Sequence, residues 1–190
     1  MNTAFVNYVR QSITVIEGCM TPEVEGTLTH VIDVLHQAVE LRLPILICGN
    51  GGSASDAEHF AAELVCRYKK NRKAFKAIAL SNCGALATAI SNDFGYDYIF
   101  SRQVEAHAEK GGVLIGITTS GKSPNIIKAL ETGKTYGLTT ITMTGRHTKD
   151  CASYSDLVLS IPSTDTPLVQ QAHLLCYHFI CDALEKKCAP

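Results

Sequence analysis

The sequence predicts an α/β fold: a three-layer sandwich in which helices cover both faces of a parallel sheet of roughly five strands. From Pro44 onward, short apolar runs alternate with segments of helical periodicity. Each run is apolar at odd and even positions alike, as expected for strands that are buried on both faces. The chain has 190 residues, 46% hydrophobic and 18% charged, which suits one domain with a sizeable core.

Two helices are predicted ahead of the first strand, over Thr3–Glu17 and from Pro22 to about Arg42. Thr21 is a good N-cap, and Pro22 suits the first helical position. Apolar residues three or four apart give the second helix one buried face: Val24, Leu28, Val31, Leu35, Ala38 and Val39. A minimal α/β sheet has no obvious place for this helix pair. The two helices therefore either cover a sheet edge or form a subunit interface.

The remaining elements follow from the alternating pattern. Strands are predicted at Pro44–Cys48, Phe75–Leu80, Val113–Thr118, Thr139–Met143 and Leu157–Ile161. Helices are predicted at Ser53–Tyr68, Cys83–Ser91, Tyr98–Glu109, Pro124–Tyr136, Lys149–Ser153 and Pro167–Lys187. No repeat, linker or low-complexity segment interrupts this pattern. We therefore expect a single domain over 1–190, with the helix pair in 1–42 and the α/β core in 44–187.

The composition argues against several classes of function. Seventeen Lys and Arg residues against eighteen Asp and Glu leave no basic excess for nucleic acid or an anionic membrane. No apolar stretch reaches the ~18 residues of a membrane span, and MNTAFVNYVRQS lacks the pattern of a signal peptide. The eight cysteines include no Cys-x-x-Cys pair, which disfavours a thiol-based redox role. Reduced thiols in a cytoplasmic protein are the expected state.

The loop after the first strand has the chemistry of an anion site. Gly49-Asn50-Gly51-Gly52-Ser53 links a buried strand to a predicted helix. Free backbone N–H groups and the helix dipole attract a phosphate at such a helix N-terminus. In a parallel sheet, ligands bind at the carboxyl ends of the strands, near the point where the strand order reverses. The loop does not extend to G-x-G-x-x-G, because Ala54 occupies the last position, so a dinucleotide site is not indicated.

A second loop, at the end of the third predicted strand, is rich in hydroxyl groups. Thr118, Thr119, Ser120 and Ser123 precede a helix that starts at Pro124. A helix N-cap would account for Ser123 alone. It would leave Thr118, Thr119 and Ser120 unexplained, so we interpret the loop as a second half of a phosphate site.

Polar residues on two helices form a candidate reactive centre. His59 and Glu63 lie four residues apart and share a helix face, which is typical of a metal or catalytic site but also of a solvated surface. The apolar final helix adds Gln170, His173 and His178. His178 lies between large aromatic neighbours and is not expected at the surface. His173 is expected to be a core histidine bonded to backbone, or a group that supports the site from behind.

Four stretches of the chain resemble the sugar isomerase (SIS) domain family: CGNGGSASDAEHFAAEL, SNDFGY, ITTSGKSPN and PSTDTPLVQQAHLL. They extend from the first strand to the last helix. The hydroxyl-rich stretch is typical of SIS domains in general, whereas the first and last resemble one isomerase branch of the family. The resemblance implies a flavodoxin-like or Rossmann-like SIS fold. It also implies a homotetramer with active sites at subunit interfaces.

The resemblance further implies roles for individual residues. The positions that match substrate contacts are Asn50, Gly51, Gly52, Ser53, Glu63, Asn92, Asp93, Thr118, Thr119, Ser120, Ser123 and Gln170. The positions that match ligands of one zinc ion per subunit are His59, Glu63, Gln170 and His178. The chain departs from the family at Leu168, where members often have Arg. That difference removes any ion pair or substrate contact made there.

The implied reaction converts sedoheptulose 7-phosphate to D-glycero-D-manno-heptose 7-phosphate through an enediol, in heptose biosynthesis for lipopolysaccharide core or other surface glycans. It needs a base for a C–H proton and an acid for the oxygen. Glu63 is the expected base and His178 the expected acid. Zinc would polarise the carbonyl, although these residue types do not by themselves select zinc. Gln170 and His178 are about 12 Å apart along a helix, so they share a metal only if their side chains lean together or a neighbouring subunit supplies one.

Two alternatives stay open at this point. A non-catalytic SIS-domain protein that binds a sugar phosphate, or regulates another protein such as a replication initiator, would keep the phosphate loops. It would not need His59, Glu63, Gln170 and His178 together. An isomerase or epimerase that acts on another sugar phosphate in the same pocket is equally compatible with these residues, because pocket shape decides the length of the sugar.

Overall fold

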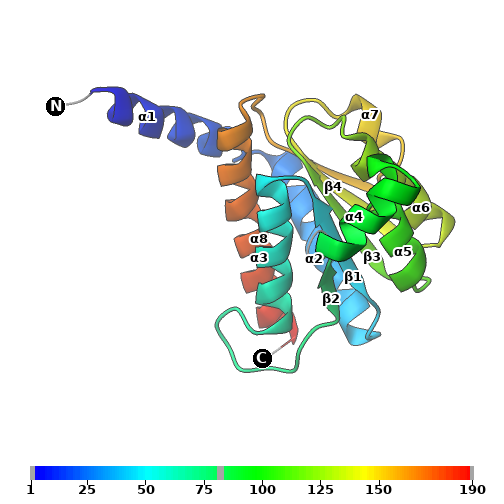
Figure 1. The fold of residues 1–190 in the computed structure, drawn as a ribbon. Helices are drawn as coiled ribbons and strands as arrows, with labels where there is room; N and C mark the ends of the chain where they lie inside the picture. Colours follow the sequence, from blue (N-terminus) through cyan, green and yellow to red (C-terminus); the bar gives the residue numbers. More distant parts are fainter. Residues whose placement is uncertain (1–2, 81–83, 189–190) are drawn as a thin grey trace.

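The computed structural model describes residues 3–80 and 84–188 and confirms the predicted fold class (Figure 1). Five parallel strands form one sheet in the order β2-β1-β3-β4-β5. Their bounds are Ile45–Gly49 for β1, Ala77–Ala79 for β2, Val113–Thr118 for β3, Thr139–Thr144 for β4 and Leu157–Ser160 for β5. The strand order reverses between β1 and β3. Such a reversal opens a crevice at the carboxyl ends of these two strands.

Helices cover both faces of the sheet (Figure 1). One layer contains α2 (Pro22–Glu40), α3 (Gly52–Val65) and α8 (Thr166–Cys188). The opposite layer contains α4 (Gly84–Asp93), α5 (Ser101–His107) and α6 (Pro124–Thr135). Successive residues of a strand point to opposite faces, so Ile115 packs in the first layer and Leu114 in the second. A 3₁₀ helix, η1 (Tyr96–Tyr98), and the short α7 (Lys149–Ala152) complete these elements.

Local sequence explains the helix starts that position the layers. Thr21 caps α2, because its Oγ1 accepts a hydrogen bond from Val24 N at 3.2 Å. Pro22 and Pro124 occupy the first positions of α2 and α6, as predicted. All five residues of β1 are buried, which agrees with its continuous apolar run.

Some predicted strand and helix bounds were wrong, for physical reasons. The strand predicted over Phe75–Leu80 is limited to β2, which pairs only with Ile45–Ile47 of β1. As edge strands, β2 and β5 are also partly exposed rather than buried on both faces. The helix predicted to Tyr68 ends at Val65, because Tyr68 N donates a hydrogen bond to the Glu185 side chain instead of continuing the helix.

The region between α3 and β3 differs most from its prediction. The single helix predicted over Tyr98–Glu109 is divided into η1 and the shorter α5. Gly95, with φ of 96°, starts the separate turn of η1. The helix predicted from Cys83 corresponds to α4, and Cys83 itself lies outside the described residues.

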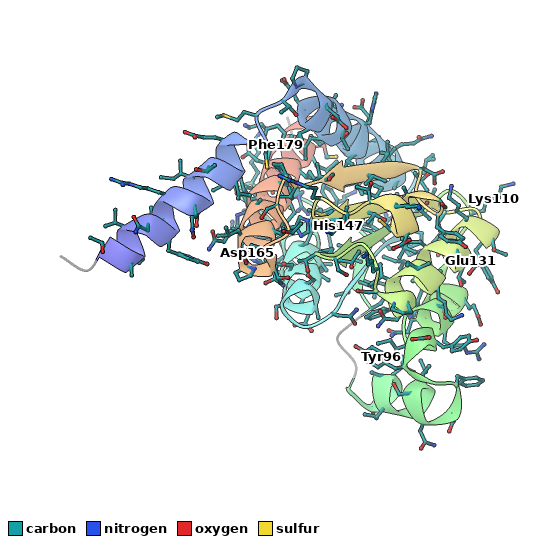
Figure 2. All side chains as sticks on the ribbon, turned by 90° about the horizontal axis from the view of Figure 1, so that it is seen from above. Tyr96, Lys110, Glu131, His147, Asp165 and Phe179 are labelled. Carbon is teal, nitrogen blue, oxygen red and sulfur yellow. The ribbon has the colours of Figure 1, made fainter. Side chains whose placement is uncertain are left out.

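The two N-terminal helices occupy different environments. Helix α2 packs on the sheet and buries Val31, Leu35 and Ala38. Helix α1 (Thr3–Glu17) has no buried residue and projects from the rest of the molecule, with side chains on all sides (Figure 2). Its exposed residues include Phe5 at 70% and Ile13 at 47%. Among the described residues, no helix combines the length and apolar character of a membrane span.

Candidate active site

A pocket of about 310 Å³ lies at the carboxyl ends of β1 and β3, where the strand order reverses. Its walls come from the glycine loop after β1, the hydroxyl loop after β3 and the start of α8. The lining residues of the two loops include Asn50, Gly51, Gly52, Ser53, Thr118 and Ser123. The two loops predicted to bind phosphate therefore face one cavity.

The glycine loop needs its glycines for two separate reasons. Gly51 has a φ of 56°, a left-handed conformation that favours glycine. At Gly52, a Cβ would lie 2.6 Å from Gln170 Nε2 on α8, so a larger residue would displace the Gln170 amide from its place beside the loop. Among the described residues, the backbone hydrogen bonds of this turn begin with Ser53 N, which bonds Asn50 O at 3.0 Å. The N–H groups of Gly51 and Gly52 thus remain for an anion at the start of α3.

The hydroxyl loop holds its side chains toward one another. Thr118 Oγ1 lies 3.0 Å from Ser123 Oγ and 3.5 Å from Ser120 Oγ. Ser123 occupies the N-cap position of α6, yet its side chain makes no capping hydrogen bond. The alternative that Ser123 serves only as a helix cap is therefore not supported. The clustered hydroxyls can instead donate to the oxygens of a phosphate.

Two residues that the sequence did not single out fix the orientation of Asn50. The amides of Asn50 and Asn125 bond each other in both directions, each at 2.9 Å, and Asn125 is 1% exposed. Tyr96 OH, from η1, donates to Asn50 Oδ1 at 2.9 Å. One N–H of the Asn50 amide remains to bind a sugar hydroxyl. Asn125 and Tyr96 lie inside the stretches ITTSGKSPN and SNDFGY, but no local spacing pairs them with Asn50.

Asn92 and Asp93, predicted to contact substrate, are not in the pocket. Both are exposed at the end of α4, where Asn92 Nδ2 donates to Asp93 Oδ1 at 2.9 Å. Thr119 does line the pocket, and its Oγ1 lies 3.3 Å from Thr166 Oγ1 at the start of α8. Thr166 is a further lining residue that the sequence did not single out.

A second group of polar residues lies further along α3 and α8. His59 Nε2 and Glu63 Oε1 are 3.1 Å apart, and one potential ligand atom each from His59, Glu63 and His178 lie within 4.8 Å of one another. His178 Nε2 is buried and has no hydrogen-bond partner among the described residues. Burial, followed by the nearby His59, lowers the pKa of His178 and keeps the imidazole neutral. A neutral imidazole with an unused nitrogen beside a carboxylate fits a divalent metal such as zinc.

A tyrosine and an aspartate lie behind this group. The Tyr177 hydroxyl is 3.0 Å from His59 Nδ1, and the Tyr177 ring is fully buried and stacked on Phe60. The same hydroxyl is within hydrogen-bonding reach of the Asp56 carboxylate. Burial raises the pKa of both Asp56 and Tyr177, so the phenol keeps its proton. Asp56 Oδ2 is buried without a hydrogen-bond partner in the described part of the chain.

Helices α3 and α8 run parallel and side by side (Figure 1). The pocket lies at their starts, and the polar group lies further along the same two helices. Gly52 meets Gln170 at the starts of the two helices, and His59 meets Tyr177 about two turns further along. Gln170 Nε2 lies 3.4 Å from Ser53 Oγ, so Gln170 belongs to the pocket in this chain. The structure thus unites three members of the predicted metal set and leaves Gln170 about 12 Å along α8 from His178.

His173 and Leu168 are parts of the protein core. His173 is fully buried, and its Nε2 lies 3.2 Å from Thr144 O. Burial lowers the pKa of His173 to about 4, so this histidine is neutral and structural. Leu168 is 6% exposed, so an apolar side chain fills the position where family members often have Arg.

Comparisons with known proteins show the family to which the chain belongs. The SIS domain family profile matches residues 6–145. The chain is 50% identical over 155 residues to the phosphoheptose isomerase of Helicobacter pylori strain P12, covering 82% of this chain and 81% of that protein. It is 45% identical over 175 residues to the phosphoheptose isomerase of Citrifermentans bemidjiense, covering 92% and 89%.

A solved structure extends the likeness to the whole fold. The phosphoheptose isomerase GmhA from Neisseria gonorrhoeae matches with a TM-score of 0.91 at 34% identity, covering 97% of this chain and 98% of that chain. The parallel sheet with a pocket at its switch point defines an α/β protein of the doubly wound class, and the chain belongs to the SIS domain family. Within this family, its relatives over most of its length are phosphoheptose isomerases.

Proposed function

We propose that this chain is an aldose–ketose isomerase that converts sedoheptulose 7-phosphate to D-glycero-D-manno-heptose 7-phosphate through an enediol. The observation that most supports this function is the parallel pairing of α3 and α8. It aligns an anion pocket at the helix starts with a carboxylate and two histidines further along the same helices. A protein that only bound the sugar phosphate would not need the carboxylate of Glu63 beside His59 and His178.

The spacing of the two groups favours a long sugar phosphate. His59 and Glu63 follow Ser53 by about 9 and 15 Å along the axis of α3. A phosphate held by the start of α3 and by the hydroxyls of Thr118 and Ser123 would leave the far end of an extended sugar beside Glu63. The amides of Asn50 and Gln170 line the same pocket and can bind sugar hydroxyls.

Proton transfer divides between two residues. Glu63 takes the C–H proton, because a carboxylate is an acceptor at neutral pH. His178 serves the oxygen as a neutral imidazole, because burial lowers its pKa and makes the imidazolium scarce. This arrangement resembles other isomerase sites in which a neutral imidazole polarises a carbonyl.

One zinc ion per subunit belongs to the proposal. His59, Glu63 and His178 would hold it, and Gln170 would become the fourth ligand only if its amide left Ser53. Bound zinc supplies a Lewis acid that polarises the sugar carbonyl. The orphaned nitrogen of His178 supports this assignment, since buried polar atoms are usually satisfied.

The same proposal places the enzyme in the cytoplasm, in a pathway for the heptose of lipopolysaccharide core or another surface glycan. The described cysteines are free, as expected where thiols stay reduced. The phosphate pocket leads to a direct test. A coupled assay should detect turnover of sedoheptulose 7-phosphate and little turnover of unphosphorylated sedoheptulose. Binding of the phosphate without turnover would favour the regulatory alternative.

Replacing Ser120 and Ser123 with alanine should mainly raise KM for the phosphorylated sugar. Each lost hydrogen bond to a charged group is worth about 1.5–3 kcal/mol, which corresponds to roughly 10–150-fold. The unphosphorylated sugar is the matched control, because its low kcat/KM should not change. If the double variant discriminates between the two sugars as well as wild type does, the loop does not bind phosphate.

A homotetramer is proposed from the apolar surface of α1 and its surroundings. An apolar groove of about 540 Å³ runs between the α1–α2 turn and α8, and the exposed Phe179 lines it. Ile13→Glu, on the exposed apolar face of α1, should shift sedimentation from a tetramer toward smaller species. Gln11→Glu is the control, because Gln11 is an exposed polar residue of the same helix. A wild-type protein that is monomeric at fully active concentrations would contradict the interface.

A further inference from the structure

The two ring nitrogens of His59 have different neighbours. Nε2 faces Glu63 Oε1 at 3.1 Å, and Nδ1 faces the Tyr177 hydroxyl at 3.0 Å. A neutral imidazole carries one proton, so only one of its nitrogens donates at a time. In the arrangement without a metal, Nε2–H donates to the Glu63 carboxylate. The Tyr177 hydroxyl then donates to Nδ1.

A cation at Nε2 requires the opposite arrangement. Coordination uses the lone pair of Nε2, so the single proton of neutral His59 must lie on Nδ1. Nδ1–H then needs an acceptor, and the Tyr177 oxygen lies 3.0 Å from Nδ1. A hydroxyl can accept this bond only if its own hydrogen turns elsewhere.

Asp56 provides the place for that hydrogen. Its carboxylate is within hydrogen-bonding reach of the Tyr177 hydroxyl, and its Oδ2 is buried without a partner in the described part of the chain. An unsatisfied buried carboxylate oxygen is costly and rare, so it points to a bond that forms in another state of the site. Asp56, His59 and Glu63 lie on one face of α3, one turn apart.

We propose that Asp56 and Tyr177 are positioning residues for His59, and that the Tyr177 hydroxyl reverses its hydrogen bond when a divalent cation binds Nε2. The reversal moves one proton of His59 from Nε2 to Nδ1 by exchange with water, so the ring stays neutral. The Tyr177 hydroxyl turns its hydrogen from Nδ1 to Asp56 and accepts from Nδ1–H. This inference rests on the metal centre of the proposed function and adds the residues that prepare His59 for it.

The packing of Tyr177 favours such a role. The Tyr177 side chain is 0% exposed, and its ring is stacked on that of Phe60, with ring centroids 5.2 Å apart. The ring can therefore stay in place while its hydroxyl hydrogen turns from Nδ1 toward the Asp56 carboxylate. A carboxylate that bonds the group behind a metal-binding histidine also orients the ring and raises its basicity as a ligand.

The test is zinc affinity, measured by competition with a chromophoric chelator on the full chain. A second cluster, formed by His36, Glu40 and Cys188, could bind zinc as well, so all proteins carry Cys188→Ser. Tyr177→Phe keeps the buried ring and should weaken zinc binding about 10–100-fold. Tyr68→Phe is the matched control: its ring lies 5.7 Å from that of His178, but its hydroxyl has no place in the proposed chain of bonds.

A double-mutant cycle separates positioning from a general structural effect. Asp56→Asn should weaken zinc binding in the parent protein. It should have little further effect in the Tyr177→Phe background, because Asp56 acts on His59 through the Tyr177 hydroxyl. If Tyr177→Phe fails to fold, the zinc affinity of Asp56→Asn tests the proposal by itself. Wild-type affinity in Tyr177→Phe, or fully additive effects, would overturn the inference and leave the metal centre standing. A parent protein that binds no zinc would overturn both.

Nitrogen NMR of labelled histidine gives a readout that is independent of affinity and activity. Metal-free His59 should carry its proton on Nε2, and addition of zinc should move it to Nδ1. In the zinc-bound Tyr177→Phe protein the Nδ1 proton should exchange faster with water, because it has lost its acceptor. Equal exchange in both proteins would contradict the proposed bond to Tyr177.

Discussion

Replacing Glu63 with glutamine is expected to lower kcat by about 10²–10⁴-fold, the usual contribution of a positioned base. Glutamine keeps the shape of the side chain but cannot accept the C–H proton. Glu63 is 23% exposed and lies 3.1 Å from His59 Nε2, so the substitution changes the centre of the polar group rather than its surroundings. Binding of sedoheptulose 7-phosphate should persist, since the pocket proposed for the phosphate is lined by other residues.

Solvent deuterium exchange at the reacting carbon makes the measurement specific. It reports proton abstraction directly and should disappear in Glu63→Gln. His178→Asn should retain some exchange if His178 serves only the oxygen, and should abolish it if the two roles are reversed. Glu58→Gln is the control, because Glu58 is an exposed glutamate of the same helix. Near-normal turnover and exchange in Glu63→Gln would rule out the enediol mechanism as assigned.

Replacing Glu185 with glutamine should lower the free energy of unfolding by about 3–5 kcal/mol, as expected when one partner of a buried ion pair is removed. Glu185 is 2% exposed, and it accepts hydrogen bonds from the backbone N–H groups of Tyr68, Lys69 and Lys70 at 2.8–2.9 Å. Its Oε1 also lies 3.3 Å from Arg72 Nε, whose side chain is 5% exposed. The variant would leave the Arg72 charge buried without its partner.

The effect of Glu185 reaches the active site through Arg72. Arg72 donates hydrogen bonds to Glu63 O and Leu64 O, both at 2.8 Å, and so closes the end of the helix that bears the proposed base. Loss of Glu185 should therefore lower activity as well as stability. Urea unfolding measures the stability, with Asp182→Asn as control. Asp182 pairs with Lys69 and Lys186 at the surface of the same helix, where an ion pair is worth only about 0–1 kcal/mol.

The stability difference between wild type and Glu185→Gln should depend on pH in a defined direction. Burial opposes ionisation of Glu185, but the bonds from the Lys70, Lys69 and Tyr68 backbone and the charge of Arg72 lower its pKa overall. A lowered folded-state pKa contributes stability above the unfolded value of about 4.3, and this contribution is lost as the pH falls further. The difference between wild type and Glu185→Gln should thus be full at neutral pH and shrink in acid. A difference that stays constant down to strongly acidic pH would contradict the charged pair.

Local sequence was sufficient for the elements and loops that depend on neighbouring residues. The apolar runs predicted the five strands, Thr21 and Pro22 predicted the start of α2, and the glycines after β1 predicted a loop that lines a pocket. His59 and Glu63 share a face of α3 because a helix places residues four apart together. Each of these predictions needs only a local period or a backbone preference.

Contacts between distant segments were decided by the tertiary structure. Packing of α8 parallel to α3 brings Tyr177 and His178 to His59, and it places Gln170 against Ser53 instead. Folding of the sheet also joins Asn125 to Asn50, whereas the predicted contacts Asn92 and Asp93 remain exposed on α4.

The sequence by itself determined the fold class, the two loops that line the pocket and the His59–Glu63 pair, because these follow from periodicity and turn chemistry within short segments. The tertiary structure alone decided which further side chains meet them. The helix starts, the side-chain volumes in the core and the point where the strand order reverses together fix the distance and rotation between α3 and α8. A one-residue change in that alignment would rotate α8 by about 100° and replace Tyr177 and His178 with other residues.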